Sequence, residues 1–464
     1  MERLSTTSAG AFDRLMQEAE ALASEDSRDE IVGTFYRTTR SICEESVTYQ
    51  TQAGRSEKLD AVLTSPVWGF PMMLAMLGVV IYMTIAGANI PSDMLASLFG
   101  AGEEVLTLAF QAVGAPDWLY GVLVLGLYRG TSWVVSVMLP PMLIFFPVFA
   151  LLENFGYLPR VAFNMDRLFK RSGGHGKQSL TMAMGFGCNA AAIVSTRIIE
   201  SPRERMLAIL TNNFVPCNGR WPMLIMLSSL FMAAGFAGGW QTLATAAVVM
   251  GMVLIGIAVT LIVSWTLSRT ALRGVPTHYT LELPPYRRPK VWNTIVRATM
   301  DKSVFVLKRA VKVAAPAGVL TWILANIHWG GSSVLEHIIG FLDPFAYTLG
   351  LDGTILMAFI LGLPANEIVL PILLMGYLST GAMTEVNDLA SLKQVFIDHG
   401  WTWLTALNVM LFSLLHYPCG TTLYTIYKET RSPKWTFFAA VIPTLIAVGV
   451  TFTVAQMVRG FGWV

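Results

Sequence analysis

The stretch MGFGCNAAAIVSTRIIE, residues Met184–Glu200, sets the expected fold. It places Gly-Phe-Gly-Cys-Asn inside an apolar run, and Arg197 and Glu200 follow the run directly. Two glycines so close together interrupt a helix, and this break carries a thiol and an amide. Helices that are broken inside an apolar run are typical of secondary transporters, whose substrate sites lie at such breaks.

The composition of the whole chain is that of a membrane protein. Of its 464 residues 54% are hydrophobic and only 13% are charged, with a mean hydropathy of +0.56. A soluble domain carries about 25% charged residues, so a polytopic membrane protein is expected. The four cysteines, Cys43, Cys188, Cys217 and Cys419, are too widely spaced for a secreted disulfide framework. The polar N-terminus shows no cleaved signal peptide.

Four segments follow from the hydropathy pattern. Residues 1–65 form a polar cytoplasmic lead-in, in which LMQEAEALA (Leu15–Ala23) is a candidate amphipathic helix. Residues 66–266 and 303–464 form two membrane regions, separated by a basic cytoplasmic loop over 267–302. Runs long enough to cross about 30 Å of hydrocarbon cover roughly 67–88, 130–152, 206–232, 243–266, 304–327, 403–427 and 435–457.

The distribution of basic residues orients these runs. Lys and Arg gather in 160–177, 267–302 and 428–434, which are therefore expected in the cytoplasm together with the N-terminus. Segments 89–117 and 326–352 contain neither residue type, and 380–402 contains only Lys393, so these should face outward. Two further apolar runs, about 178–196 and 353–379, are interrupted by Gly, Pro and polar residues. With the N-terminus in the cytoplasm, the number of spans agrees with the charge distribution if both interrupted runs are re-entrant. Hydropathy alone does not distinguish a re-entrant hairpin from a broken full span.

An internal repeat supports this organisation. GFGCNAAAIV (Gly185–Val194) resembles GLPANEIV (Gly362–Val369), and each is followed by a second break that contains Pro-Cys. The second breaks are FVPCNGR (Phe214–Arg220) and HYPCGTT (His416–Thr422). Two halves of opposite orientation with paired broken helices place a transport site at the interface of the repeats.

The side chains at the breaks indicate what is transported. Non-helical backbone at membrane depth is tolerated where it lines a wet cavity. Sulfur with a few oxygens suits a transition metal such as Fe(II), whereas Mg(II) and Ca(II) prefer oxygen alone. The candidate pathway residues are Cys188, Asn189, Cys217, Asn218, Asn366, Glu367 and Cys419.

Each candidate also has a purely structural interpretation. A cysteine in an apolar helix is commonly a small hydrophobic residue. Glu367 is the strongest candidate, because a carboxylate at bilayer depth is expensive and marks a pathway or a paired charge. Glu153, in PVFALLENFGY (Pro147–Tyr157), is an eighth candidate that could equally be interfacial.

No enzyme motif is visible. SGGHGKQS (Ser172–Ser179) departs from the phosphate-binding loop at Arg171 and Gln178, so no bound nucleotide is expected in this chain. The histidines show no zinc spacing.

The stretch from Ala150 to Arg220, LPANEIV and YPCGTTLYTIYKET (Tyr417–Thr430) closely resemble the membrane domain of the FeoB family of bacterial ferrous-iron transporters. The resemblance runs from about residue 55 to about residue 455. It implies an all-α polytopic membrane protein with two inverted gate repeats that contain broken or re-entrant helices. It also implies that Cys188, Cys217 and Cys419 are the pathway cysteines.

The chain departs from the family pattern in three ways. The family usually has an N-terminal GTP-binding domain, which is not seen here; a split system, a membrane half that works alone and an engineered fragment all stay open. A polar lead-in from Met1 favours a native standalone chain. The family tends to have Ser-Cys-Ser-Ala-Arg at Pro216–Arg220, and Ala-Lys-Glu at Ala365–Glu367. Without that lysine Glu367 has no adjacent cation, so either the pathway is more anionic here or the metal preference has shifted.

The resulting expectation is a multi-pass transporter of the bacterial inner membrane that imports Fe(II). A gate-repeat carrier of an organic solute such as a nucleoside, and a non-transporting scaffold or signalling partner, are the alternatives. Expected partners are the lipid bilayer, a separate GTP-binding subunit, a small FeoA-like cytoplasmic protein and further copies of the chain, with no nucleic acid.

Overall fold

The computed structural model describes residues 25–46, 55–65, 67–236, 239–274, 286, 290–383 and 388–462. The chain forms two compact units, residues 1–58 and 59–464. The first unit contains helix α2 (Glu25–Ser46), and α3 (Arg55–Leu63) begins at its end. The candidate helix over Leu15–Ala23 lies outside the described residues.

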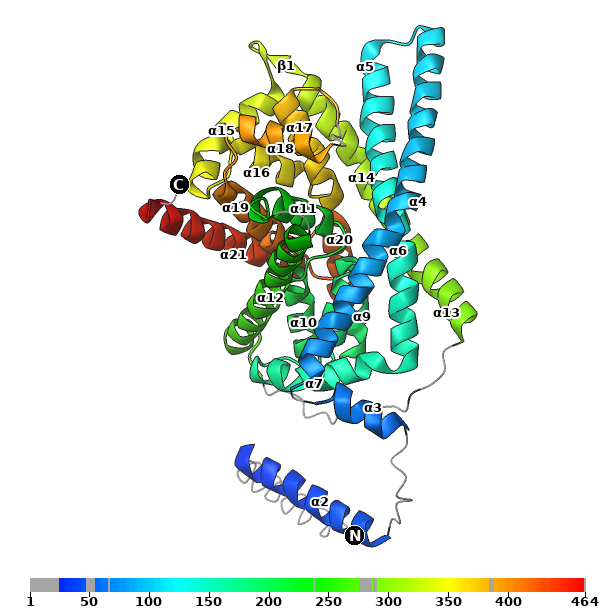
Figure 1. Ribbon diagram of the computed structural model, residues 1–464, viewed down its shortest axis with the longest axis vertical. Helices are drawn as coiled ribbons and strands as arrows, with labels where there is room; N and C mark the ends of the chain where they lie inside the picture. The colour runs from blue at the N-terminus through cyan, green and yellow to red at the C-terminus, as the bar shows by residue number, and fades with distance from the viewer. Residues whose placement is uncertain are drawn as a thin grey trace, which may run out of the picture. The chain divides into compact units, whose positions relative to one another are not determined.

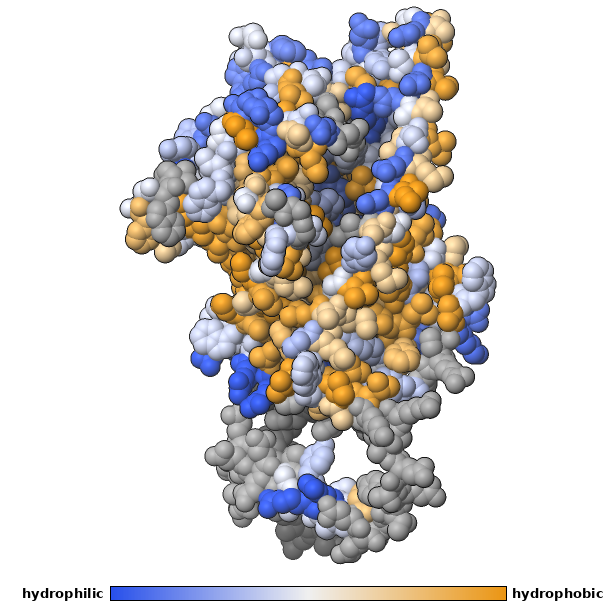
Figure 2. Space-filling model, in the orientation of Figure 1, coloured by the Kyte–Doolittle hydropathy of each residue, from blue (hydrophilic) through white to orange (hydrophobic). Residues whose placement is uncertain are grey.

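The second unit has the surface of a membrane protein. On the face shown in Figure 2, hydrophobic residues form a wide band across the helices, with hydrophilic residues on both sides of it. Val79, Ile262 and Leu445 are 52%, 61% and 65% exposed, which would be unfavourable in water. Within the described residues, four helices are long and apolar enough to cross a membrane: Gly69–Val113, Asp117–Phe155, Trp240–Arg269 and Pro433–Gly460. The helices Val334–Thr348 and Gly353–Leu361, which are bent by 111° at the break between them, would make a fifth span if the pair counts as one. The multi-pass prediction is confirmed.

A long helical hairpin begins the second unit. Helix α4 (Gly69–Val113) has 45 residues and therefore extends about 67 Å, twice the hydrocarbon thickness. The chain turns at Gly114, which is in the left-handed conformation, and returns through α5 (Asp117–Tyr120), the wider π-type turn η1 (Gly121–Tyr128) and α6 (Arg129–Phe155). Residues 89–113, which the hydropathy pattern placed outside the span, thus continue the same helix (Figure 1).

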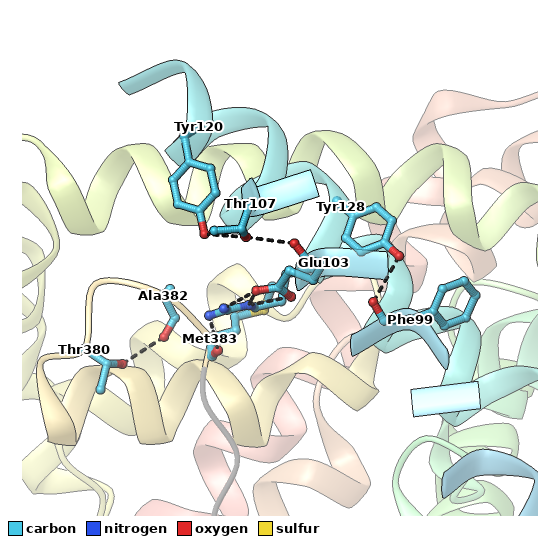
Figure 3. Close-up of polar contacts among 9 residues, drawn as sticks. Phe99, Glu103, Thr107, Tyr120, Tyr128, Thr380, Ala382 and Met383 are labelled. Atoms are coloured by element: carbon cyan, nitrogen blue, oxygen red, sulfur yellow. Dashed lines mark hydrogen bonds and ion pairs between the residues drawn. The ribbon is translucent and has the colours of Figure 1, made fainter. Parts of the chain in front are cut away.

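Polar contacts join the two arms of this hairpin beyond its apolar part. Arg129 Nε donates to both carboxylate oxygens of Glu103 at 3.1 Å, and Tyr128 donates to the Phe99 carbonyl at 3.0 Å. Arg129 also donates from Nη1 to the carbonyl of Met383 at 3.4 Å, which ties the hairpin to the segment after α17 (Figure 3). These contacts help to explain how the helix continues past the apolar run, because the Glu103 carboxylate is paired with Arg129.

The first half of the bundle follows this hairpin. Its elements are α7 (Tyr157–Arg171), α8 (Gln178–Gly185), α9 (Asn189–Ser195), η2 (Thr196–Ile198), α10 (Pro202–Thr211), η3 (Asn212–Phe214), α11 (Trp221–Leu227), η4 (Ser228–Met232) and α12 (Gly239–Arg269). Local sequence sets the boundaries. For example, the Ser201 side chain caps α10 by accepting from the Glu204 N–H, and Pro202 occupies the first helical position.

The second half repeats this order. Its elements are α13 (Val291–Ala298), η5 (Thr299–Ser303), α14 (Val304–Asn326), β1 (His328–Trp329), β2 (Ser332–Ser333), α15 (Val334–Thr348), α16 (Gly353–Leu361), η6 (Asn366–Ile368), α17 (Val369–Leu378), α18 (Leu389–Asp398), α19 (Trp403–Leu415), α20 (Gly420–Thr430) and α21 (Pro433–Gly460). Strands β1 and β2 pair antiparallel, with His328 opposite Ser333. Helix α13 lies within residues 267–302, so part of the predicted basic loop is helical.

The main helices of the two halves follow the same order and are inverted, while β1, β2 and α18 of the second half have no counterpart among the described residues of the first. In each, a helix (α7 or α15) precedes an interrupted run (α8–α9 or α16–α17), a broken helix (α10–α11 or α19–α20) and a long helix (α12 or α21). Helix α8 packs against α9, and α16 packs against α17, so each interrupted run folds back as a hairpin. Figure 1 shows α7 at one end of the unit and α15 at the opposite end. The expected inverted repeats with broken helices are confirmed.

Three segments meet beside α7. Arg160, whose side chain is 2% exposed, donates to the Asp60 carboxylate from Nε at 3.0 Å and from Nη2 at 3.2 Å. Tyr286, from the basic loop, donates to Asp60 Oδ1 at 2.7 Å and lies under the Arg160 guanidinium at 4.1 Å. The Arg160 hydrogen bonds hold the pKa of Asp60 below its ordinary value, and burial with the Asp60 bond raises the pKa of Tyr286 to about 12.

Candidate functional site

The first interrupted run brings Cys188 to the start of a helix. Helix α8 ends at Gly185, and Cys188 then adopts an extended conformation (φ −154°, ψ 118°) as the residue before α9. Gly187 is required between them because a Cβ at that position would overlap the ring of Phe145. Asn189 follows as the first residue of α9 and is 3% exposed.

The second interrupted run has the same local geometry. Ala365 precedes η6 with φ −152° and ψ 126°, almost the angles of Cys188. Ala365 therefore corresponds to Cys188, and Asn366 corresponds to Asn189, as the sequence repeat indicated. The thiol of the first half has no equivalent in the second, which instead adds the carboxylate of Glu367.

The two breaks within each half are tied together at corresponding positions. In the first half the N–H of Asn218, which follows Pro-Cys, donates to the Gly187 carbonyl at 3.1 Å. In the second half the N–H of Gly420, which also follows Pro-Cys, donates to the Leu363 carbonyl at 2.6 Å. A backbone group left unpaired by one break thus pairs with a group left unpaired by the other.

All four breaks line one cavity. Seven of the eight predicted site residues contribute to its wall: Cys188, Asn189, Cys217, Asn218, Asn366, Glu367 and Cys419. Glu153 does not line it, because that side chain is exposed near the end of α6. Two thioethers that the sequence interpretation missed, Met138 and Met142 of α6, complete the sulfur-bearing wall.

Contacts across the cavity join the two repeats. The Asn366 amide donates to the Cys217 sulfur at 3.6 Å, and the carboxylate of Glu367 lies against the backbone of Gly219. The side-chain amide oxygen of Asn366, Oδ1, is buried and has no hydrogen-bond partner among the described residues. An unpaired buried oxygen is costly, so this atom is available to a ligand in the cavity.

A buried arginine supports the site from behind. Arg220, 1% exposed, donates to the carbonyls of Asn213 and Leu414 at 2.8 and 2.9 Å, and to those of His416 and Tyr417 at 3.3 Å. It thereby fixes the second break of both repeats. It directly follows Gly219, whose backbone lies against the Glu367 carboxylate. Glu367 therefore has a cationic neighbour, which comes from the other repeat and not from its own run.

The cavity presents its possible metal ligands separately. No group of three or more His, Cys, Asp or Glu within the described residues is arranged to hold a metal ion. The cavity offers three thiols, two thioethers, one carboxylate and several amide oxygens as separate ligands. Soft and borderline ligands of this kind suit a transition-metal ion, and conduction requires sites weak enough to release it.

Comparisons with known proteins agree with this architecture. The family model "Gate: Nucleoside recognition" matches twice, at residues 135–231 and 307–433, which are the two repeats. A second model, "Ferrous iron transport protein B C terminus", matches residues 249–301. No solved structure matches the chain.

Several curated proteins are similar over most of the chain. The Fe(2+) transporter FeoB of Staphylococcus aureus (strain MSSA476) is 28% identical over 460 residues, covering 96% of this chain and 65% of its own length. The FeoB of Methanocaldococcus jannaschii is 28% identical, with coverages of 86% and 58%. A fusion of Fe(2+) transport protein A with FeoB from Porphyromonas gingivalis is 25% identical, with coverages of 95% and 55%. The chain thus spans less than two thirds of the length of each of these relatives.

The fold and the cavity define an all-α polytopic membrane protein built from two gate repeats. Within that class, the chain belongs to the FeoB family of ferrous-iron transport proteins.

Proposed function

We propose that this chain conducts Fe(II) across the bacterial inner membrane into the cytoplasm, with its N-terminus on the cytoplasmic side. The observation that carries the proposal is the convergence of four helix breaks on a cavity with three thiols and one carboxylate. The printed names of the relatives, Fe(2+) transporters, support the same cargo.

In the proposed mechanism the ion exchanges ligands step by step. Sulfur atoms of Cys188, Cys217 and Cys419 and the free oxygen of Asn366 replace part of its water shell. Glu367 offsets the positive charge, while Arg220 keeps that carboxylate from binding the ion too tightly. Water fills the remaining positions, because open backbone at the breaks needs solvent or protein partners.

Nucleotide binding is assigned to another subunit or segment. The turn between α7 and α8 does not have the sequence of a phosphate-binding loop. A separate GTP-binding subunit is therefore a proposed partner. A FeoA-like protein is another, supported by the fused relative of Porphyromonas gingivalis. A homo-oligomer is also proposed.

An organic solute is the second candidate, because the gate model is described as nucleoside recognition. The wall of the cavity argues against it. None of the residues that line the cavity is aromatic, whereas a nucleobase is usually held by stacking on aromatic side chains.

Uptake into proteoliposomes that contain the purified chain separates these functions. We expect saturable accumulation of ascorbate-reduced Fe(II) that excess uridine does not inhibit. Uridine uptake without Fe(II) uptake would favour the solute carrier. A third outcome is that the protein takes up neither Fe(II) nor uridine when it is folded, inserted in both orientations and supplied with a nucleotide-binding partner. That result would favour the non-transporting scaffold.

A further inference from the structure

Helix α20 has a polar face that begins at the cavity. Thr421 and Thr422 are adjacent, and Thr425 and Glu429 follow at spacings of three or four residues, so the four lie on one side of the helix. All four are buried, the threonines to 4%, 1% and 1% exposure and the Glu429 side chain to 7%. Buried polar groups in a membrane helix are expensive and mark functional routes.

The first part of this face belongs to the cavity wall. Thr421 and Thr422 line the cavity, and the Thr422 hydroxyl lies 3.2 Å from the Cys419 sulfur. An ion bound at Cys419 therefore has hydroxyl oxygen as its next ligand in the direction of the helix axis.

The middle of the face carries a positive charge. Arg309 of α14 donates from Nη1 to the Thr425 hydroxyl at 2.9 Å. The hydroxyl row is thus held by a side chain from a neighbouring helix, and a cation that passes here meets a fixed guanidinium.

The far end of the face is closed by ion pairs between the repeats. Arg197, after α9, donates to Glu429 from Nε at 2.9 Å and from Nη2 at 2.7 Å, and Arg205 of α10 donates at 2.9 Å. Helix α9 packs against α20, so the two helices that directly follow Cys188 and Cys419 lie together. The arginines belong to the first repeat and the carboxylate belongs to the second.

The length of α20 fits a route from the cavity to the membrane surface. Ten residues separate Cys419 from Glu429, which corresponds to about 15 Å along the helix. That distance is half of a hydrocarbon core of about 30 Å, so a cavity near the midplane would reach the surface at Glu429.

We propose that the polar face of α20 is the cytoplasmic part of the ion's route, and that Glu429 with Arg197 and Arg205 forms its gate. In the closed state the two arginines occupy the carboxylate and present positive charge to a leaving cation. When the repeats separate there, the arginines leave and Glu429 becomes a ligand for the divalent cation. The cation as cargo rests on the proposed function, but the gate itself does not.

Thiol labelling tests the gate independently of iron. A chain that retains Cys419 as its single cysteine, with alanine at 43, 188 and 217, is placed in sealed vesicles of known orientation. A membrane-impermeant, positively charged methanethiosulfonate is added to the side that exposes Glu429. We expect Glu429→Gln and Arg197→Gln each to accelerate labelling of Cys419 at least fivefold.

The control is Lys177→Gln, which breaks an exposed ion pair with Glu200 and lies off the route. It should label at the parent rate. The Arg197 side chain is 64% exposed, so Arg197→Gln should fold even if Glu429→Gln does not, and it then tests the gate alone. Labelling at the parent rate in both gate variants would overturn the proposal. Faster labelling of the gate variants, together with no Fe(II) uptake by the chain that keeps all four cysteines, would keep the gate and refute the cargo.

Discussion

The carboxylate of Glu367 lies against the backbone of Gly219, across the interface of the two repeats. A Cβ at residue 219 would overlap that carboxylate, so only glycine leaves room for it. We expect Gly219→Ala to push Glu367 out of position and to lower Fe(II) uptake at least fivefold. Initial uptake rates in proteoliposomes measure this effect. Gly235→Ala is the control, since a Cβ there meets nothing within 4 Å.

Removal of the Glu367 charge should abolish most transport without unfolding the protein. Glu367→Gln keeps the shape of the side chain, and insertion should improve slightly because a carboxylate at membrane depth costs about 2.5–3.5 kcal/mol. We expect Fe(II) uptake to fall at least tenfold while the elution profile in detergent is unchanged. Glu153→Gln, exposed and outside the cavity, should transport normally. Wild-type uptake by Glu367→Gln would make Glu367 structural.

Much of the fold follows from hydropathy alone. The apolar runs at 243–266, 304–327 and 435–457 correspond to α12, α14 and α21 within a few residues. The cavity could be predicted because glycine and proline at membrane depth mark breaks, and breaks of paired repeats converge. Cys188 and Asn366 were therefore recognisable from the sequence.

Other features depend on partners that are distant in the chain. Helix α4 continues through Glu103 because Arg129 neutralises that carboxylate, 26 residues later. The role of Arg220 can be recognised only from the structure, where carbonyls of the other repeat accept hydrogen bonds from it. Met138 and Met142 look like ordinary core residues; their i, i+4 spacing on one helix face is the single signal that could have identified them.

The guanidinium of Arg220 should be needed for stability in a way that lysine cannot replace. Its planar donors reach carbonyls of both second breaks, and an ammonium would leave some of these buried groups unpaired. We expect Arg220→Lys to destabilise the protein by about 1–3 kcal/mol, seen as a lower melting temperature in detergent. Arg167→Lys, on the exposed side of α7, should melt like the wild type.

The thiols should set the metal preference. Serine in place of Cys188 or Cys217 substitutes a hard oxygen for sulfur in a cavity that otherwise keeps its size. We expect Cys188→Ser to lower Fe(II) uptake severalfold and to raise the Mn(II) to Fe(II) uptake ratio. Competition between the two ions in one preparation measures this ratio. Cys43→Ser, in the first unit, should leave it unchanged, and an unchanged ratio in Cys188→Ser would place that thiol off the pathway.

The contact between Asp60 and Arg160 should make the stability of the fold depend on pH. Asp60→Asn leaves the buried Arg160 guanidinium without its carboxylate, and we expect a loss of about 1–3 kcal/mol at pH 7. Thermal unfolding in detergent measures it. Glu200→Gln, at an 83% exposed side chain, serves as the matched control.

The pH dependence follows from the lowered pKa of Asp60. A carboxylate whose pKa is lower in the folded state contributes its full stabilisation above its ordinary pKa of 3.8, because between the two pKa values the folded state binds fewer protons than the unfolded state. This contribution is lost as the pH falls through the lowered pKa, since the wild-type carboxylate is then protonated as well. The melting temperatures of wild type and Asp60→Asn should therefore converge as the pH is lowered from 7 to below about 4. A gap of constant size over this range would show that the Asp60 charge does not hold Arg160, and that the loss in Asp60→Asn has a steric cause.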